Sequence, residues 1–290
     1  MRSRFISRVS WGKAVSDDRS LYRVIEPSQG WKALRWRELW AHRELLFFFV
    51  WRDLKVRYKQ TALGAAWALV QPLAALLIFS LVLGRVVGVP SEGVPYPLFA
   101  YTALVPWTYF SSTLTQATNS VVRQAHLIRR VAFPRLLIPA SGALTGLVDL
   151  ILSLLPVPVL WALYGSGPSW RLLTLPLWLL LAVAVALGAG TWLAALNVRY
   201  RDVRHLVPFL VQLWFFATPV VYPSRLVPAP WRHVYALNPV AGVVEGFRWA
   251  LAGAPPPTAV LAVSTGAAAL LVVSGVIYFR HAERAFADVI

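Results

Sequence analysis

Charge-poor stretches long enough to cross a lipid bilayer recur along this 290-residue chain. A transmembrane helix needs about 20 apolar residues to cross the ~30 Å hydrocarbon layer. Only 14% of the residues are charged and 58% are hydrophobic, whereas about 25% of the residues in soluble proteins are charged. The sequence therefore predicts an all-α polytopic membrane protein with six transmembrane helices. The predicted spans are about 65–87, 97–122, 136–163, 172–198, 206–223 and 259–279.

The basic residues lie mostly on one side of these spans. An even number of spans places both termini on the same side, and 23 of the 28 Lys and Arg residues fall in the segments on that side. Because cytoplasmic loops of membrane proteins carry the excess of Lys and Arg, we expect both termini in the cytoplasm. The opposite side holds Arg85, Arg171, Arg225, Arg232 and Arg248.

The net charge of +16 is thus explained by membrane topology. A nucleic-acid-binding protein would need its cations on one soluble face, so no nucleic-acid partner is expected. The chain has no cysteine, its five histidines lie singly, and only Asp17 and Asp18 are adjacent among its twelve acids. These absences predict no metal site, disulfide or iron–sulfur cluster.

The amino-terminal segment divides into two parts. Residues 1–35 are rich in Arg and Ser, and we expect a flexible basic arm. Over residues 36–60, Trp51, Leu54 and Tyr58 recur at helical spacing while charged residues fill the other positions. This pattern predicts an amphipathic helix in the membrane interface. The alternative is a simple extension of the first span.

The connection after the second span, residues 123–135, is also amphipathic. Leu127 and Ile128 belong to an apolar stripe, whereas Arg129 and Arg130 form another face. The stretch is longer and more amphipathic than is needed to orient the spans in the membrane, so we predict a helix that docks on a partner outside the membrane. The alternative is charge that only orients the spans.

A second cytoplasmic connection, residues 197–205, packs three arginines and Asp202 into one short stretch. Arg201 and Asp202 either pair locally or contact a partner. The sequence leaves both possibilities open.

The external region 224–258 is rich in proline yet apolar. Its stretches 231–237 and 240–251 are too short to span, which favours a pair of re-entrant helices. Glu245 and Arg248 are three residues apart and share a helix face. They form either a local ion pair or a gate or headgroup contact. Residues 284–290 are the predicted cytoplasmic tail.

Several motifs, taken in order, resemble one family. They are Asp53–Gly64 with Trp67, Gln71 and Pro72, then Leu127–Arg135, then Asn197–Asp202, and finally Leu237–Pro239 with Glu245–Arg248. Together they are similar to the polysaccharide-exporting permeases of type-2 ABC transporters, which move O antigens, capsular polymers and wall teichoic acids. The resemblance covers about residues 36–283.

The resemblance implies a homodimer of six-span subunits in the bacterial plasma (inner) membrane, among membrane lipids, with two copies of a separate cytoplasmic ABC ATPase. It also implies that the substrate is a glycan or polyol phosphate carried on undecaprenyl diphosphate. No phosphate-binding Gly-x-x-x-x-Gly-Lys-Ser/Thr motif occurs, so ATP and Mg are expected on the partner and no cofactor on this chain. The chain is thus predicted to be a transport subunit and not an enzyme. The alternative is a membrane-embedded glycosyltransferase or other lipid-linked glycan enzyme, which would need clustered carboxylates.

On this basis three groups of site residues are predicted. The ATPase-coupling residues are Arg123, Leu127, Ile128, Arg129, Arg130, Phe133, Arg135, Arg201 and Asp202. The substrate-headgroup residues are Arg52, Lys55, Arg57 and Lys59. The channel or gate residues are Asp149, Trp107, Tyr109, Phe110, Phe215, Phe216, Glu245 and Arg248.

The acid within the third span needs its own explanation, because an unpaired charge there costs at least ~2.5 kcal/mol. Asp149 either lines a cavity and binds sugar hydroxyls, or is protonated and bonded to Thr145 or Ser153 on the same face. The aromatic residues likewise have two interpretations. They are interface and core residues, or they stack against sugar rings along the transport path.

Overall fold

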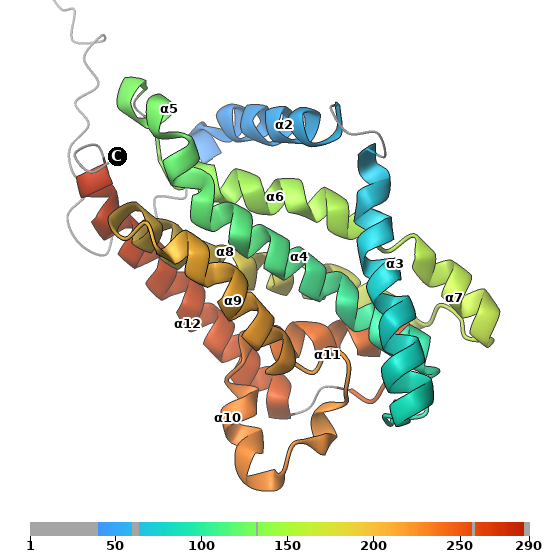
Figure 1. Cartoon of the computed structure of the whole chain (residues 1–290). Helices are drawn as coiled ribbons and strands as arrows, with labels where there is room; N and C mark the ends of the chain where they lie inside the picture. Colours follow the sequence, from blue (N-terminus) through green and yellow to red (C-terminus); the bar gives the residue numbers. More distant parts are fainter. Residues whose placement is uncertain (1–39, 60–63, 132, 257–258, 287–290) are drawn as a thin grey trace, which may run out of the picture. The chain divides into compact units, whose positions relative to one another are not determined.

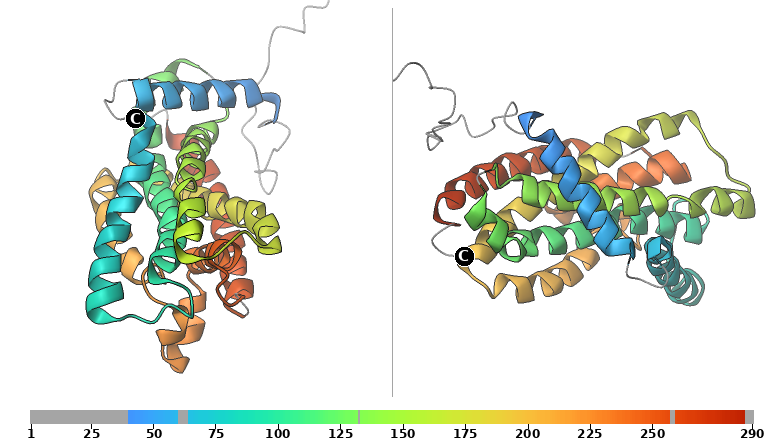
Figure 2. Two further views of the ribbon diagram at one scale, coloured as in Figure 1. Left: turned by 90° about the vertical axis from the view of Figure 1, so that its right-hand side faces the viewer. Right: turned by 90° about the horizontal axis from the view of Figure 1, so that it is seen from above.

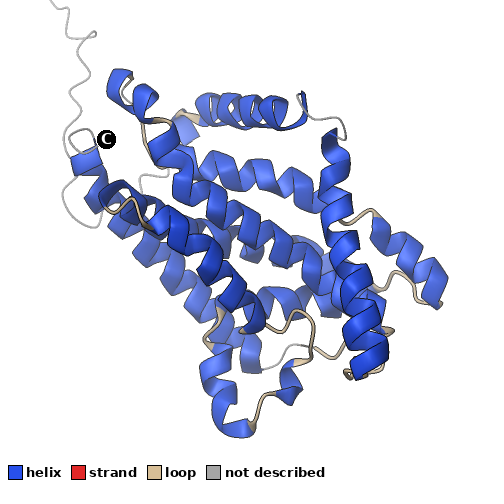
Figure 3. Cartoon of the chain, in the orientation of Figure 1, coloured by secondary structure: helices blue, strands red, loops and turns tan. Residues whose placement is uncertain are grey.

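The structure is a computed structural model that describes residues 40–59, 64–131, 133–256 and 259–286. All regular structure within these ranges is helical, with no strand among them (Figure 3). The predicted all-α fold class is therefore confirmed. The predicted arm, residues 1–35, lies outside the described part of the chain.

The helices follow one another with short connections (Figure 1). The α-helices are α2 (Arg43–Lys59), α3 (Trp67–Phe79), α4 (Tyr96–Arg123), α5 (Ala125–Arg130), α6 (Leu137–Leu152), α7 (Pro156–Tyr164), α8 (Leu175–Arg199), α9 (Val203–Phe216), α10 (Arg232–Ala236), α11 (Pro239–Ala252) and α12 (Ala259–Ala282). The short 3-10 or π segments are η2 (Gly64–Ala66), η3 (Ser80–Val87), η4 (Trp170–Thr174), η5 (Ser224–Leu226), η6 (Ala229–Trp231) and η7 (Glu283–Ala285).

Among the residues that the structure describes, four helical segments are long and apolar enough to cross a membrane. They are Gly64–Val87, Leu137–Tyr164, Trp170–Arg199 and Leu261–Ala282. They match four of the six predicted spans.

The predicted span 206–223 is shorter than expected. The helix there, α9, has 14 residues and ends at Phe216, so at 1.5 Å per residue it is about 21 Å long. That length falls short of the ~30 Å hydrocarbon layer. The helix ends just before Thr218-Pro219, because a residue that precedes proline is disfavoured in the α conformation.

The remaining predicted span, 97–122, corresponds to α4, which is the central helix. It has 28 residues and contacts α3, α6, α8, α9 and α11. Unlike the apolar helices, α4 is rich in Ser, Thr and Tyr. Two of its buried threonines bond to the helix's own carbonyls: Thr102 donates to the Leu98 oxygen at 2.9 Å, and Thr118 to the Leu114 oxygen at 2.7 Å. A polar helix is stable in this position because neighbouring helices surround it.

Close packing between α8 and α12 depends on glycine. A Cβ atom placed at Gly188 would lie 2.8 Å from the backbone nitrogen of Val272, and one placed at Gly275 would lie 2.7 Å from Thr191 Oγ1. Both distances are too short for a side chain. The two backbones therefore approach as closely as small residues allow in membrane helix pairs.

The connections gather at two ends of the bundle (Figure 1). One end carries α2, α5, the α8–α9 turn and the last turn of α12, and the ring of Phe49 on α2 lies 5.7 Å from that of Phe133. The other end carries α10, α11 and the 88–95 connection. The helix α2 lies crosswise to α3 (Figure 2), so it is not an extension of the first span.

Candidate functional site

A polar hollow lies where α2 crosses the bundle. Its volume is about 270 Å³. It forms because α2 packs on α6 while α3 and α6 both contact α4. It is lined by Arg57, Tyr58, Gly64, Trp67, Ala68, Gln71, Val105, Thr108, Tyr109, Ser112, Gln116, Asp149, Leu150 and Ser153.

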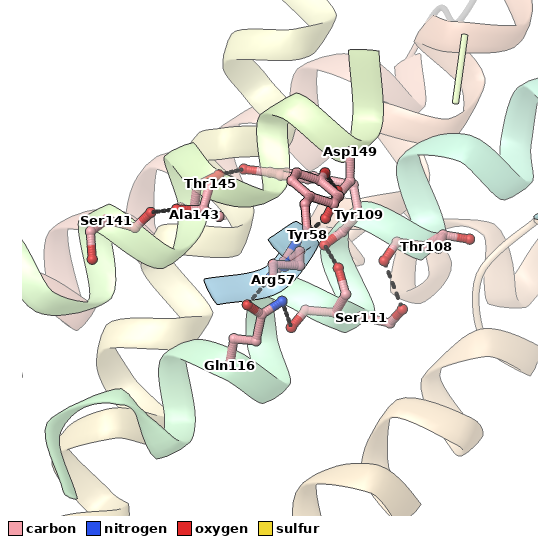
Figure 4. A network of polar contacts seen from close by, with 11 residues as sticks. Arg57, Tyr58, Thr108, Tyr109, Ser111, Gln116, Ser141, Ala143, Thr145 and Asp149 are labelled. Atoms are coloured by element: carbon pink, nitrogen blue, oxygen red, sulfur yellow. Dashed lines mark hydrogen bonds and ion pairs between the residues drawn. The ribbon is translucent and has the colours of Figure 1, made fainter. Parts of the chain in front are cut away.

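Asp149 is the acceptor at the centre of this hollow (Figure 4). Arg57 forms an ion pair with the carboxylate oxygen Oδ2, and the Tyr58 hydroxyl donates to the other oxygen, Oδ1. The second terminal nitrogen of Arg57 donates to the Gln116 amide oxygen. Both carboxylate oxygens thus have partners, which offsets the cost of an acid within an apolar helix.

The surroundings of Tyr58 keep its hydroxyl protonated. Burial, followed by the hydrogen bond to Asp149, raises the pKa of Tyr58 to about 12. The phenol therefore keeps its proton at neutral pH and donates a hydrogen bond to the carboxylate.

The predicted bond of a protonated Asp149 to Thr145 or Ser153 is wrong. The Thr145 hydroxyl donates to the Ser141 carbonyl at 2.8 Å, and the Ser153 hydroxyl to the Leu150 carbonyl at 2.7 Å. Short hydroxyl side chains in helices commonly bond to the preceding turn in this way. Asp149 instead lines the hollow and has partners from α2.

The apolar residues of α2 that the sequence singled out differ in how far they are buried. Phe49 is 2% exposed, Leu54 and Tyr58 are partly buried, and Trp51 is 51% exposed. The interaction of Arg57 with Asp149 turns a charged position of the helix towards the bundle. The interface location predicted for α2 stays a prediction.

The four cations predicted to bind a headgroup do not converge. Arg52 donates to the neighbouring Asp53 carboxylate at 2.8 Å, and Arg57 is engaged by Asp149. The Lys55 ammonium lies 5.3 Å from the centre of the Trp51 ring, and Lys59 is exposed at the end of α2. Arg57 faces the bundle, whereas Arg52, Lys55 and Lys59 share one face of α2 at i, i+3 and i+7 spacing.

The predicted docking helix 123–135 is shorter than expected. The helix α4 continues through Arg123, and α5 covers only Ala125–Arg130. Ile128 is 5% exposed and packs in the core, with Leu127 partly buried beside it. Arg129 and Arg130 are exposed, so the predicted separation of apolar and basic faces is present.

Two other predicted coupling residues contact other segments of the same chain. The Phe133 ring packs edge-to-face against Phe49 of α2. The backbone nitrogen of Arg135 donates to the Glu283 carboxylate at 3.2 Å, and the guanidinium of Arg135 donates to the Glu283 carbonyl. These contacts tie the α5–α6 connection to α2 and to the end of α12.

Arg201 and Asp202 are both exposed in the turn between α8 and α9. Within the described ranges no ion pair joins them, so they do not pair locally. Arg123 is exposed at the end of α4 and faces the same space as Arg201.

Most of the predicted channel aromatics pack inside this chain. Trp107 and Phe110 are 6% and 2% exposed, and the Trp107 ring lies 5.4 Å from that of Phe215 on α9. The Tyr109 hydroxyl donates to the Ala143 carbonyl at 3.1 Å. Only Phe216, at 63% exposure, presents its ring to the surroundings. For the other four, the core interpretation fits the structure.

Arg248 of α11 is buried at the opposite end of the bundle. It is 3% exposed, and its guanidinium lies 3.7 Å from the centre of the Phe99 ring. It donates to the carbonyls of Phe99, Val220 and Tyr222. No ion pair joins it to Glu245 in the described structure, and Glu245 Oε1 is buried without a hydrogen-bond partner there. The predicted local ion pair is therefore wrong.

Two members of the Asp149 network, Tyr58 and Gln116, were not predicted as site residues. The available signal for Gln116 was an amide within the predicted span 97–122, because polar side chains at such positions require partners. The acid Asp149 within the third predicted span required a partner for the same reason.

A bundle of apolar helices around one polar central helix, with a surface helix held by a buried ion pair, defines a polytopic helical membrane protein. Residues 44–252 match the ABC-2 type transporter family, and the chain belongs to this family.

Curated relatives are similar along most of their length. The chain is 33% identical over 215 residues to the O-antigen export system permease protein RfbA of Myxococcus xanthus, covering 73% of this chain and 82% of that protein. It is 29% identical over 209 residues to RfbA of Klebsiella pneumoniae, covering 71% and 79%. It is 24% identical over 201 residues to the polysialic acid transport protein KpsM of Escherichia coli, covering 69% and 78%.

Proposed function

We propose that this chain is the permease subunit of an ATP-driven exporter that moves an undecaprenyl-diphosphate-linked polysaccharide from the cytoplasmic to the external face of the bacterial inner membrane. The observation that carries the proposal is the 33% identity, across 82% of its length, to a protein named as an O-antigen export permease. An O antigen is the substrate that this similarity favours, with capsular polymer or wall teichoic acid as the other classes.

The proposed assembly is a homodimer with two copies of a cytoplasmic ABC ATPase. ATP and Mg act on the ATPase, and this chain performs no catalysis. The exposed Arg129 and Arg130 on α5 are the proposed ATPase contacts, supported by a packed inner face that would transmit force to α2 and α12. Each subunit would have six spans in the membrane, with α9 extended by the segment after Phe216.

The proposed path for the glycan follows one side of α4. A stripe of partly exposed neutral side chains runs along it: Thr108, Ser111, Ser112, Thr115, Gln116 and Asn119. Several of their donors are used within the helix, as when Thr115 donates to the Ser111 carbonyl at 2.9 Å and Asn119 to the Thr115 carbonyl at 2.9 Å. Except for the Gln116 oxygen, which accepts from Arg57, their oxygen acceptors remain available for sugar hydroxyls. Weak, repeated contacts of this kind suit a polymer that must keep moving.

A second copy of the chain would close this path. The helices α3 and α9 lie on either side of α4 and both contact it (Figure 1). Both flanking helices expose large apolar residues, for example Leu77 at 65% on α3 and Phe209 at 56% on α9. In the proposed dimer these faces meet the partner subunit or lipid, and α10 and α11 form the external gate.

Inside-out membrane vesicles test the function. Vesicles that contain this chain, its ATPase and the lipid-linked polymer should protect the polymer from an added glycosidase when ATP is supplied. Vesicles without this chain should give no protection. Glycosyl transfer from a sugar nucleotide without ATP-dependent protection would support the glycosyltransferase alternative and refute the proposal.

Cysteine labelling tests the proposed orientation, because the chain has no native cysteine. A cysteine in place of His126 on α5 should react with a membrane-impermeant maleimide only from the cytoplasmic side. One in place of Ser224 should react only from outside. The reverse pattern would refute the orientation.

A further inference from the structure

A second, larger hollow lies at the end of α4 that carries α5. Its volume is about 630 Å³, and it is formed where the α4–α5 junction faces the turn between α8 and α9. Its lining residues are Asn119, Val122, Arg123, Ala125, Asn197, Val198, Arg201, Arg204 and His205. The volume is in the range of sites that hold small ligands.

The charge of this hollow is strongly positive. Three of its lining residues are arginines, and none is acidic. Arg204 Nε donates to His205 Nε2 at 3.0 Å. Three guanidinium groups around one space repel one another unless an anion joins them. Their planar donors match the oxygens of a phosphate.

A buried amide adds a second requirement for the ligand. Asn197 is 2% exposed and its Nδ2 donates to the Thr118 carbonyl at 2.9 Å. A carbonyl can only accept, so this contact fixes the orientation of the amide. The other amide atom, Oδ1, is buried without a hydrogen-bond partner in the described structure. It can be satisfied only by a group that donates, such as a hydroxyl.

The hollow also adjoins the polar stripe on α4. Asn119 belongs to both, and it lies one helical turn after Thr115 and one turn before Arg123. A ligand with its anionic group among the arginines would therefore place an attached glycan at the start of the stripe. A carboxylate from a partner protein would satisfy the arginines but would offer no hydrogen to Asn197.

From these observations we infer that this hollow binds the phosphate and the first sugar of the lipid-linked substrate, an inference that rests on the proposed function. The arginines hold the phosphate oxygens, and Asn197 Oδ1 accepts from a sugar hydroxyl. The recognition site for the headgroup is thus the α4–α8–α9 hollow and not the 52–59 segment of α2, where Arg52 is paired with Asp53 and Arg57 with Asp149.

Binding measurements on the full-length chain, purified with its ATPase in detergent, test this site. The probe is undecaprenyl diphosphate carrying one N-acetylglucosamine, and the comparison lipids are undecaprenyl diphosphate and phosphatidylglycerol. We expect Arg201→Gln with Arg204→Gln to weaken binding of the probe at least about tenfold, since each hydrogen bond to a charged group contributes substantially. Lys55→Gln with Lys59→Gln, which removes the same charge from α2, should bind the probe as the parent does.

The buried amide gives a sharper comparison. Asn197→Ala should weaken binding of the sugar-bearing probe but leave binding of sugar-free undecaprenyl diphosphate unchanged. The apparent melting temperature of each variant checks folding. Arg201→Lys with Arg204→Lys keeps the charge and should bind with intermediate affinity.

Four results would overturn the inference. The first is parent-like binding by the Arg201→Gln, Arg204→Gln variant, and the second is a loss of binding confined to the α2 variant. The third is that the arginine variant loses affinity equally for all three lipids. The fourth is that the arginine variant loses the ATPase but still binds the probe. The last result would mean that the arginines bind an acidic surface of a partner protein. A parent protein that binds no lipid-linked probe would refute the proposed function together with this site, whereas binding that survives the arginine substitutions refutes the site alone.

Discussion

The ion pair between Arg57 and Asp149 is expected to hold α2 on the bundle, and Arg57→Gln should be the most destabilising change in it. That substitution leaves the carboxylate in its hollow with Tyr58 as its remaining partner. Removing one partner from a fully buried pair costs about 3–5 kcal/mol. Here the side chains are 26% and 24% exposed, so water compensates part of the loss and we expect about 2 kcal/mol.

Asp149→Asn should cost less, because the Arg57 cation that it leaves lies on the surface helix α2 and keeps the Gln116 oxygen as a partner, whereas Arg57→Gln leaves a carboxylate on the apolar helix α6. The double variant should be close to Asp149→Asn alone, since the carboxylate that Arg57 neutralises is already gone. The resulting coupling free energy in the double-mutant cycle should be about 1–2 kcal/mol.

Thermal unfolding in detergent, followed by the fluorescence of the 14 tryptophans, measures these differences. About 2 kcal/mol corresponds to a shift in the apparent midpoint of roughly 4–8 °C for a chain near this size. Lys59→Gln is the matched control on the same helix, because Lys59 is exposed at the end of α2 and its replacement should shift the midpoint little. Strictly additive effects of Arg57→Gln and Asp149→Asn would refute the proposed role of the pair.

Three further changes test other parts of the structure. Gly275→Ala should lower the apparent melting temperature because its Cβ would meet the backbone of α8, whereas Gly266→Ala in the same helix has open space and should not; equal midpoints would contradict the close α8–α12 packing. Arg248→Gln should destabilise by about 2–4 kcal/mol because buried carbonyls lose their donor, and a midpoint like that of the parent would show that the three hydrogen bonds are dispensable. Arg129→Ala with Arg130→Ala should lower ATP-driven export in vesicles without changing the melting temperature, and unchanged export would remove α5 from the proposed ATPase contact.

The helical framework was predictable because hydropathy and proline positions act locally. The external stretch predicted at 240–251 is the helix α11, Pro239–Ala252, since a proline at its start and a glycine after its end define it. The last predicted span likewise agrees with α12 to within three residues. The predicted length of a helix was wrong where a proline ended it before the apolar stretch did, as at the end of α9.

The sites were less predictable because their contacts join distant residues. Asp149 needed a partner, but nothing in the neighbourhood of residue 149 identifies Arg57, which is 92 positions away. Helical spacing placed Glu245 and Arg248 on one face, yet the arginine turned to carbonyls of other segments. In each case a cation had several possible partners, and tertiary packing selected one.

The polarity of α4 has a consequence for how the protein is made. Helices enter the bilayer from the translocon according to their own apolar character, and α4 carries many hydroxyl and amide groups that are favourable only among protein neighbours. Its main neighbours α6, α8 and α11 are synthesised after it. The nascent α4 therefore has to wait beside the translocon, or pair with α3, until those helices emerge. Biogenesis of this chain should accordingly be more sensitive to loss of a membrane insertase than its strongly apolar helices alone would require.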